Sequence, residues 1–241
     1  MGRLGYVAGN IAERELSLGY DEFLNRTENV AFPLLSANIV RQDTREPVFK
    51  PYVVLDVLTS SKKNIRVGVM GVVRFNPVFL KSGPGGSNLV VAPPREMVER
   101  YIGELRKRSD LVILLAALHK EKARIIAQEV PGIDIILGSY GAIYSTREEP
   151  EGETQILYSG NQGRRIGETR VFLDPEQHME RTTSFTHFLT ARYPSDPEMQ
   201  EFVNQVVAEV NEHKRVQKEK VGQTTPTPDL PTAVSGSGSS R

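Results

Sequence analysis

The chain lacks several features on which whole classes of function depend. Its 241 residues include no cysteine, which excludes disulfides, thiolate zinc sites, iron–sulfur clusters, c-type haem attachment and cysteine nucleophiles within it. No apolar run approaches the roughly 20 residues of a membrane-spanning helix, and the longest, at 111–118, is the size of a strand. Because the formal net charge is zero, we expect neither nucleic acid nor a membrane surface as a partner.

Histidine is scarce, with four residues in the whole chain. A two-metal site needs several His, Asp or Asn ligands that converge from loop ends, and four scattered histidines do not supply them. His119 has the most suitable position because it follows a buried strand. It is interpreted either as a weak candidate for a metal ligand or as a solvated residue that caps the next helix.

The order of the expected elements indicates an α/β fold. Apolar runs predict strands, and helical spacing predicts helices between them. Asp110 and Asp134 are interpreted as ordinary residues at the starts of buried strands. The expected strands are 33–39, 49–58, 64–73, 111–115, 133–137, 154–158 and 168–173, and the expected helices are 13–24, 93–107 and 120–129.

The last fifty residues differ in character from the rest. Residues 195–198 read Ser-Asp-Pro-Glu, which predicts a helix capped by Ser195 with proline in its first turn. The tail is rich in Thr, Pro, Ser and Gly, so it is expected to be disordered. The predicted organisation is therefore a domain at 1–192, a helix at 193–221 and a tail at 222–241.

Three glycine-containing loops could border a site. Residues 137–142 read Leu-Gly-Ser-Tyr-Gly-Ala after a predicted buried strand, where α/β proteins place their chemistry. Residues 160–167 combine glycines with two arginines and are interpreted as a β-turn with solvated arginines or as an anion cradle. The loop at 81–88 has no following helix start and is expected to be flexible.

Four stretches, taken together, resemble one family. They read Glu-Arg-Glu-Leu-Ser-Leu-Gly at 13–19, Ala-Phe-Pro-Leu-Leu-Ser-Ala-Asn-Ile at 31–39, Val-Pro-Gly-Ile-Asp-Ile-Ile-Leu-Gly at 130–138, and Tyr-Ser-Gly at 158–160 with two later glycines. Their order and spacing resemble the calcineurin-like metallophosphoesterases, in the branch of the 5′-nucleotidases and UDP-sugar hydrolases. The resemblance implies an αββα sandwich and an extracytoplasmic setting.

The resemblance also implies where two metal ions would be bound, and these positions are altered. Two of the family's five motifs are expected upstream of the first residue, so the sandwich is expected to lack its first strand or strands. The third motif places Glu13 and Arg14 at the metal-ligand asparagine and the catalytic histidine. The fourth motif places Ala117 where the family has a ligand histidine, and His119 lies two residues after that position. The fifth motif places Tyr140 and Ala142 where the family has two histidines.

These substitutions predict a site that has lost its metal chemistry. Tyrosine and alanine do not replace imidazole as ligands, and arginine holds a fixed positive charge. Glu13 and His119 remain weak candidates for metal ligands. Arg14, Tyr140 and Arg164 are hypothesised to form a cationic pocket for an anion.

A second resemblance concerns the C-terminal region. Some bacterial extracytoplasmic proteins join a similar altered domain to a multihaem cytochrome c module, through a helix that begins Tyr-Pro-x-Asp-Pro-Glu and a Pro-rich linker. Residues 193–198 and the tail resemble that junction. A multihaem cytochrome is therefore the partner that the resemblance implies.

The sequence thus predicts a non-catalytic phosphoesterase-like domain that serves binding or assembly and has no cofactor. The alternative is a metal-dependent hydrolase of phosphoric esters or nucleotides. In that case an N-terminal segment or a partner chain would supply the missing motifs, and divalent metal ions would be required.

Overall fold

A computed structural model describes residues 4–12, 14–75, 88–140, 144–145 and 149–223. The chain divides into two compact units, Met1–Thr190 and Ala191–Arg241. Residues 81–87 of the loop expected at 81–88 and the tail from 224 onward lie outside the described residues, as do Glu13 and Ala142. In the described part, no helix is both long and apolar enough to cross a membrane.

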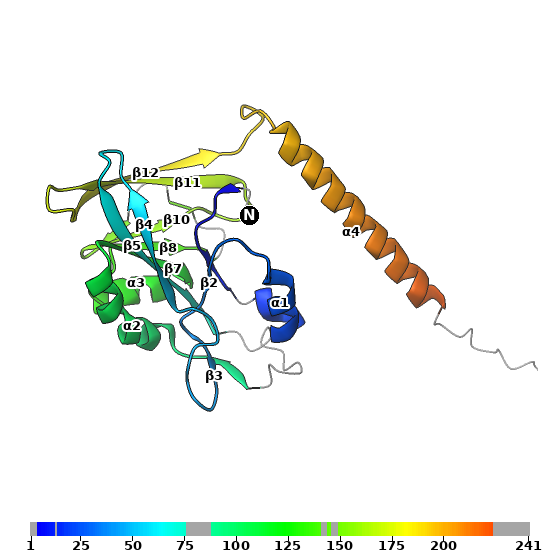
Figure 1. Ribbon diagram of the computed structural model, residues 1–241, viewed down its shortest axis with the longest axis horizontal. Coiled ribbons are helices and arrows are strands. Elements are labelled where there is room, and N and C mark those ends of the chain that lie inside the picture. The colour runs from blue at the N-terminus through cyan, green and yellow to red at the C-terminus, as the bar shows by residue number, and fades with distance from the viewer. Residues whose placement is uncertain (1–3, 13, 76–87, 141–143, 146–148, 224–241) are drawn as a thin grey trace, which may run out of the picture. The chain divides into compact units, whose positions relative to one another are not determined.

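A six-stranded mixed sheet forms the centre of the first unit (Figure 1). Its order is β4-β5-β7-β8-β10-β9, and β5, β7, β8 and β10 run parallel to one another. The outer strands β4 and β9 pair antiparallel with β5 and β10. The bounds are β4 Tyr52–Leu58, β5 Asn64–Val73, β7 Leu111–Ala117, β8 Ile135–Gly138, β9 Glu149–Glu151 and β10 Thr154–Tyr158.

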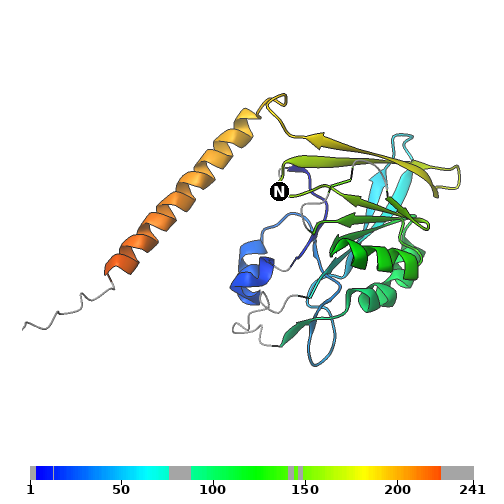
Figure 2. The same cartoon turned by 180° about the vertical axis from the view of Figure 1, so that it is seen from behind.

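Two helices cover one face of this sheet (Figures 1 and 2). Helix α2, Pro94–Arg108, buries Met97, Val98, Ile102 and Leu105, and begins with proline at a position where a missing N–H costs nothing. Helix α3, Lys120–Glu129, ends just before Pro131, which disfavours continuation of a helix. Their apolar side chains pack with the helix-facing side chains of the sheet in one core.

Short strand pairs cover the opposite face. Strands β11, Arg165–Leu173, and β12, Met179–Phe188, form an antiparallel hairpin, and Val171 and Leu173 pack against Ile65, Val67 and Val69 of β5. Strands β1, Gly9–Asn10, and β2, Leu34–Leu35, form a parallel pair near β5. The expected mixed α/β architecture is confirmed: helices, central sheet and strand pairs form successive layers.

Several expected element boundaries are wrong for local reasons. The helix expected at 13–24 is a 3-10 helix, η2 Glu15–Leu18, followed by α1, Tyr20–Thr27, because Gly19 takes a φ of 102° between them. The strand expected at 33–39 is divided between β2 and β3, Ile39–Arg41, which pairs with β6, Leu89–Val91. Residues 179–188, for which the sequence predicts no element, form β12.

The second unit contains helix α4, Pro197–Gln223, so the expected C-terminal helix is confirmed. Its cap differs from the expected one. The Asp196 carboxylate, rather than Ser195, accepts a hydrogen bond from the Met199 N–H at 3.0 Å. The helix therefore begins with Asp196 at the N-cap and Pro197 as its first residue.

Asp110 and Asp134 serve the strands as expected. The Asp134 carboxylate accepts the Val112 N–H at 2.6 Å and pairs with Arg106. The Asp110 carboxylate accepts the backbone N–H of Arg66 at 2.8 Å and pairs with its guanidinium at 2.9 Å. These bonds fix the start of β7 against β5.

The Asp110 pair gives the fold a pH dependence. The Arg66 side chain, followed by the Arg66 backbone N–H, holds the pKa of Asp110 below its usual value. A lowered pKa in the folded state adds stability above the unfolded pKa of about 3.9, and this stability is lost as the pH falls through the folded value. We expect Asp110→Asn to lower the free energy of unfolding at pH 7, with the difference shrinking below about pH 4. Urea unfolding of both proteins across this range measures it; a difference independent of pH would contradict the assignment.

Candidate functional site

The carboxyl ends of the parallel strands form the candidate site. Strands β5, β7, β8 and β10 end at one edge of the sheet, and α/β proteins bind ligands beyond this edge. The next residues along the chain include Arg74 after β5, His119 after β7 and Tyr140 after β8. Because β5, β7 and β8 are neighbours in the sheet, these three side chains meet.

Tyr140 lies between the other two side chains. Its ring centroid is 4.1 Å from that of His119, with the two rings inclined at 63°. The guanidinium carbon of Arg74 lies 4.4 Å from the Tyr140 ring centroid, within the range of a cation–π contact. The Arg74 N–H also donates to the Ala117 carbonyl at 3.0 Å, which places Arg74 beside the end of β7.

A cavity of about 530 Å³ opens beside Arg74 and His119. Its basic lining residues are Arg74, Arg95, His119 and Lys122, and its apolar wall includes Phe75 and Ile126. Arg95 is partly neutralised, because it forms ion pairs with Glu129 at 2.7 Å and Glu99 at 3.3 Å. No carboxylate is among the described residues that line the cavity, so its lining favours anions over cations.

The remaining sequence-predicted site residues lie apart from this group. Arg14 is exposed and precedes η2, where its carbonyl accepts the Ser17 N–H at 3.1 Å. Ala117 is buried at the end of β7 and packs in a small core with Ile11 and Val73. Arg164 is exposed in the turn before β11. Among the described contacts, neither Arg14 nor Arg164 reaches Tyr140, and their proposed anion-binding role stays a prediction.

His119 agrees in part with its interpretation as a solvated residue that caps the next helix, and its role as a metal ligand stays a prediction. It is exposed and immediately precedes α3, and its backbone carbonyl accepts the N–H groups of Lys122 and Ala123. Its imidazole makes no capping hydrogen bond and instead packs against Tyr140. The backbone, and not the ring, therefore serves the helix.

The donor set at this edge does not fit a divalent metal. Such ions take imidazole, carboxylate or thiolate ligands in groups of three or four. Across the part of the chain that the structure describes, no three His, Cys, Asp or Glu side chains are arranged to hold a metal ion. At the strand ends the His119 imidazole packs against the Tyr140 ring, and the Arg74 guanidinium also contacts this ring. The positive charge of Arg74 repels a cation. We therefore derive no chemical step through a metal.

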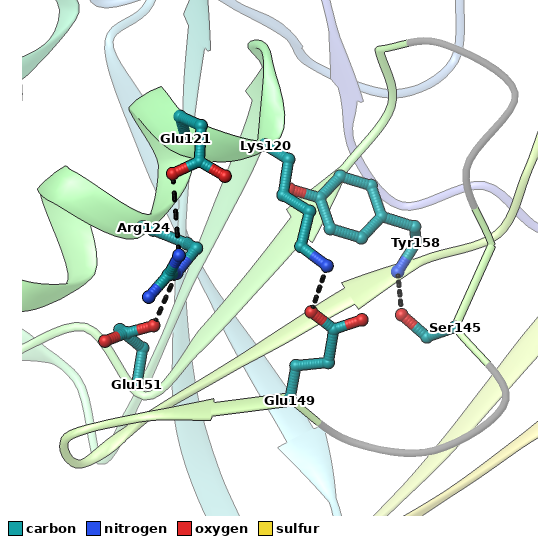
Figure 3. A network of polar contacts seen from close by, with 7 residues as sticks. All are labelled: Lys120, Glu121, Arg124, Ser145, Glu149, Glu151 and Tyr158. Carbon is teal, nitrogen blue, oxygen red and sulfur yellow. Dashed lines mark hydrogen bonds and ion pairs between the residues drawn. The ribbon is translucent and has the colours of Figure 1, made fainter.

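Tyr158, the last residue of β10, is buried beside the end of β8. Its ring lies against Gly138 and points toward Lys120 on α3 (Figure 3). Ion pairs of Lys120 with Glu149 at 2.6 Å and of Arg124 with Glu151 at 2.7 Å join α3 to β9 around it. Burial, with the nearby charge of Glu149, raises the pKa of Tyr158 to about 12. Its hydroxyl is thus neutral at physiological pH and supplies no base.

Sequence reasoning missed Arg74 and Lys122. Arg74 is a polar residue that follows an expected strand, and the same signal identified His119. Only the order of the strands in the sheet shows that Arg74 meets Tyr140. Lys122 is one of several lysines and arginines on α3, and nothing in the sequence distinguishes it. The described part of the loop at 137–142 lies at the sheet edge as expected, with Gly138 as the last residue of β8, and residues 141 and 142 lie outside the described residues.

Comparisons with known proteins give a consistent family. No family model matches the chain. It is 26% identical over 148 residues to the 2′,3′-cyclic-nucleotide 2′-phosphodiesterase/3′-nucleotidase of Salmonella typhimurium, covering 56% of this chain and 23% of the relative. It is 28% identical over 178 residues to the 5′-nucleotidase of Rattus norvegicus, covering 69% of this chain and 30% of the relative. The chain thus spans about a third or less of the length of these two relatives.

The fold comparison agrees. The calcineurin-like phosphoesterase YfkN from Bacillus subtilis superposes with a TM-score of 0.74 at 17% identity, and the match covers 89% of this chain and 73% of YfkN. At this identity the likeness concerns the fold alone. The chain is thus similar in sequence to part of these nucleotidases and shares the fold of a calcineurin-like phosphoesterase.

Proposed function

We propose that this phosphoesterase-like domain binds a ligand without hydrolysing it. The observation that carries the proposal is the contact of Arg74, Tyr140 and His119 at the carboxyl edge of the sheet. A two-metal hydrolase needs carboxylate and imidazole ligands at such an edge. A guanidinium packed on a phenol ring, next to a basic cavity, instead suits an anion.

The experiment compares metal content and turnover on one folded sample. The purified chain is soaked in manganese or zinc and desalted, its bound metal is counted, and it is assayed with a generic phosphate ester and a nucleotide. We expect less than a tenth of an equivalent of metal and no turnover above that of a His119→Ala variant. Near-stoichiometric metal with turnover would overturn the proposal and support the hydrolase alternative.

The assembly part of the proposal names a multihaem cytochrome c as partner and an extracytoplasmic setting. Its support is the resemblance of residues 193–198 and the tail to the junction that precedes such haem modules. The same folded sample is titrated with a purified multihaem cytochrome, and complex formation is followed by analytical ultracentrifugation. Absence of a complex at tens of micromolar of each protein would remove the cytochrome from the proposal.

A further inference from the structure

A second cavity lies on the other face of the central sheet. Its volume is about 400 Å³, within the usual range for small-molecule sites. One wall is apolar and comes from the central sheet, with Ile135 and Leu157 among its side chains. The facing wall comes from β11 and β12 and carries hydroxyl groups, including those of Thr169 and Ser184. The cavity is therefore amphipathic.

Arg165 is the one charged side chain among the described residues that line this cavity. It is the first residue of β11, within the glycine-containing turn and strand that the sequence marked as a possible anion cradle. The sequence hypothesis chose its neighbour Arg164, which is exposed. Arg165 shares one side of β11 with the cavity-lining residues Thr169 and Val171, because alternate residues of a strand face the same side, whereas Arg164 lies in the turn before the strand.

Two aromatic rings fix the Arg165 guanidinium. Its central carbon lies 4.2 Å from the ring centroid of Tyr144 and 4.9 Å from that of Phe188. The two rings are 5.8 Å apart and nearly perpendicular, at 82°. A guanidinium in contact with two rings loses little further freedom when it binds an oxyanion, so the group is preorganised.

One hydrogen-bond donor of the Arg165 guanidinium has no partner in the described part of the chain. Its Nε atom is buried, and it has no hydrogen-bond acceptor among the described residues. The hydroxyl groups nearby are already engaged: Thr169 and Ser184 bond each other at 3.1 Å, and Thr186 donates to the Ser145 carbonyl at 2.7 Å. A buried charged donor without an acceptor is unfavourable, and an oxyanion in the cavity would remove that cost.

We propose that this cavity binds a small organic monocarboxylate. The carboxylate accepts from Arg165, whose planar fork matches its two oxygens. The apolar body lies along Ile135 and Leu157. A single positive charge in the cavity matches a single negative charge, whereas a phosphate dianion would leave charge unpaired in an otherwise neutral lining. This site does not depend on the proposed function, because it lies on the opposite face of the sheet from α2 and α3.

The test titrates the full chain with octanoate by isothermal calorimetry. Arg165→Gln removes the charge, and Arg164→Gln is the matched control one residue away on the exposed side. We expect one octanoate per chain for the natural sequence and for Arg164→Gln, and at least tenfold weaker binding for Arg165→Gln. Equal affinities of the two variants, or no saturable binding to the natural sequence, would overturn the proposal.

A second variant keeps the test decisive if Arg165→Gln fails to fold. Gly167 lines the cavity, and a Cβ there would lie 3.6 Å from the Ser159 Cβ, an ordinary contact. Gly167→Val is thus expected to fold, to occupy part of the cavity and to weaken octanoate binding at least tenfold while retaining Arg165. Octylamine and octyl phosphate test the head group. Binding of either as tightly as octanoate would overturn the carboxylate assignment.

Discussion

Gly138→Ala is expected to destabilise the domain by about 3 kcal/mol, at the upper end of the cost of overpacking a core. A Cβ on Gly138 would lie 2.1 Å from Tyr158 Cε1 and 2.6 Å from Cδ1. Tyr158 cannot move aside easily, because it is only 3% exposed and lies beneath the α3–β9 ion pairs (Figure 3). Gly138 is also paired in register with both Tyr158 and Ala116 at the centre of the sheet.

Gly103 provides the control for this prediction. It lies inside α2, is exposed, and a Cβ there would meet nothing within 4 Å. Gly103→Ala is expected to stabilise the domain by about 0.5–1 kcal/mol through helix propensity. Urea unfolding of the two variants measures both effects. If Gly138→Ala were as stable as the natural sequence, the close packing of Gly138 and Tyr158 would be wrong.

The same packing explains why the loop at 137–142 keeps its first glycine. The family resemblance assigns Gly138 to the glycine of a metal-binding motif. In this structure the position is required by the Tyr158 ring, irrespective of any metal. Packing alone therefore accounts for a glycine at this position, and its presence says nothing about metal chemistry.

The helices that cover the sheet were predictable because their signals are local. The bounds expected for α3 agree with the structure, since a buried strand precedes it and Pro131 follows it. Strand β12 was not predictable in the same way. Its sequence, Met-Glu-Arg-Thr-Thr-Ser-Phe-Thr-His-Phe, has few apolar residues, and the strand is held by pairing with β11 along its length. Tertiary pairing outweighs the weak local signal there.

The candidate site was predictable only in part, for a related reason. Tyr140 and His119 each follow an expected strand, so their positions at a sheet edge could be foreseen. Their contact with each other and with Arg74 depends on the order β5-β7-β8, which the sequence does not state. Arg165 likewise lines its cavity because it is the first residue of β11, whereas Arg164 lies in the turn before it.

Asn38→Ala is expected to lower the free energy of unfolding by about 3–5 kcal/mol, because the Asn38 side chain bonds three buried backbone groups. Its Nδ2 donates to the Val73 carbonyl at 2.7 Å and to the Ala92 carbonyl at 3.0 Å. Its Oδ1 accepts the Val73 N–H at 2.8 Å. Asn38 is fully buried, and each backbone group left without a partner costs about 1–3 kcal/mol.

These bonds also position the candidate site, because Val73 directly precedes Arg74 and Ala92 lies just before α2.

Asn38→Asp tests the hydrogen bonds of this side chain while its size and shape stay nearly constant. Its carboxylate keeps the bond from the Val73 N–H but faces two carbonyl oxygens without a donor, so it is expected to be at least as unstable as the alanine variant at pH 7. Asn25→Ala, on the exposed side of α1, is the control and is expected to change stability by less than about 0.5 kcal/mol. Equal unfolding free energies for the Asn25 and Asn38 variants would show that Asn38 does not join β5 to α2.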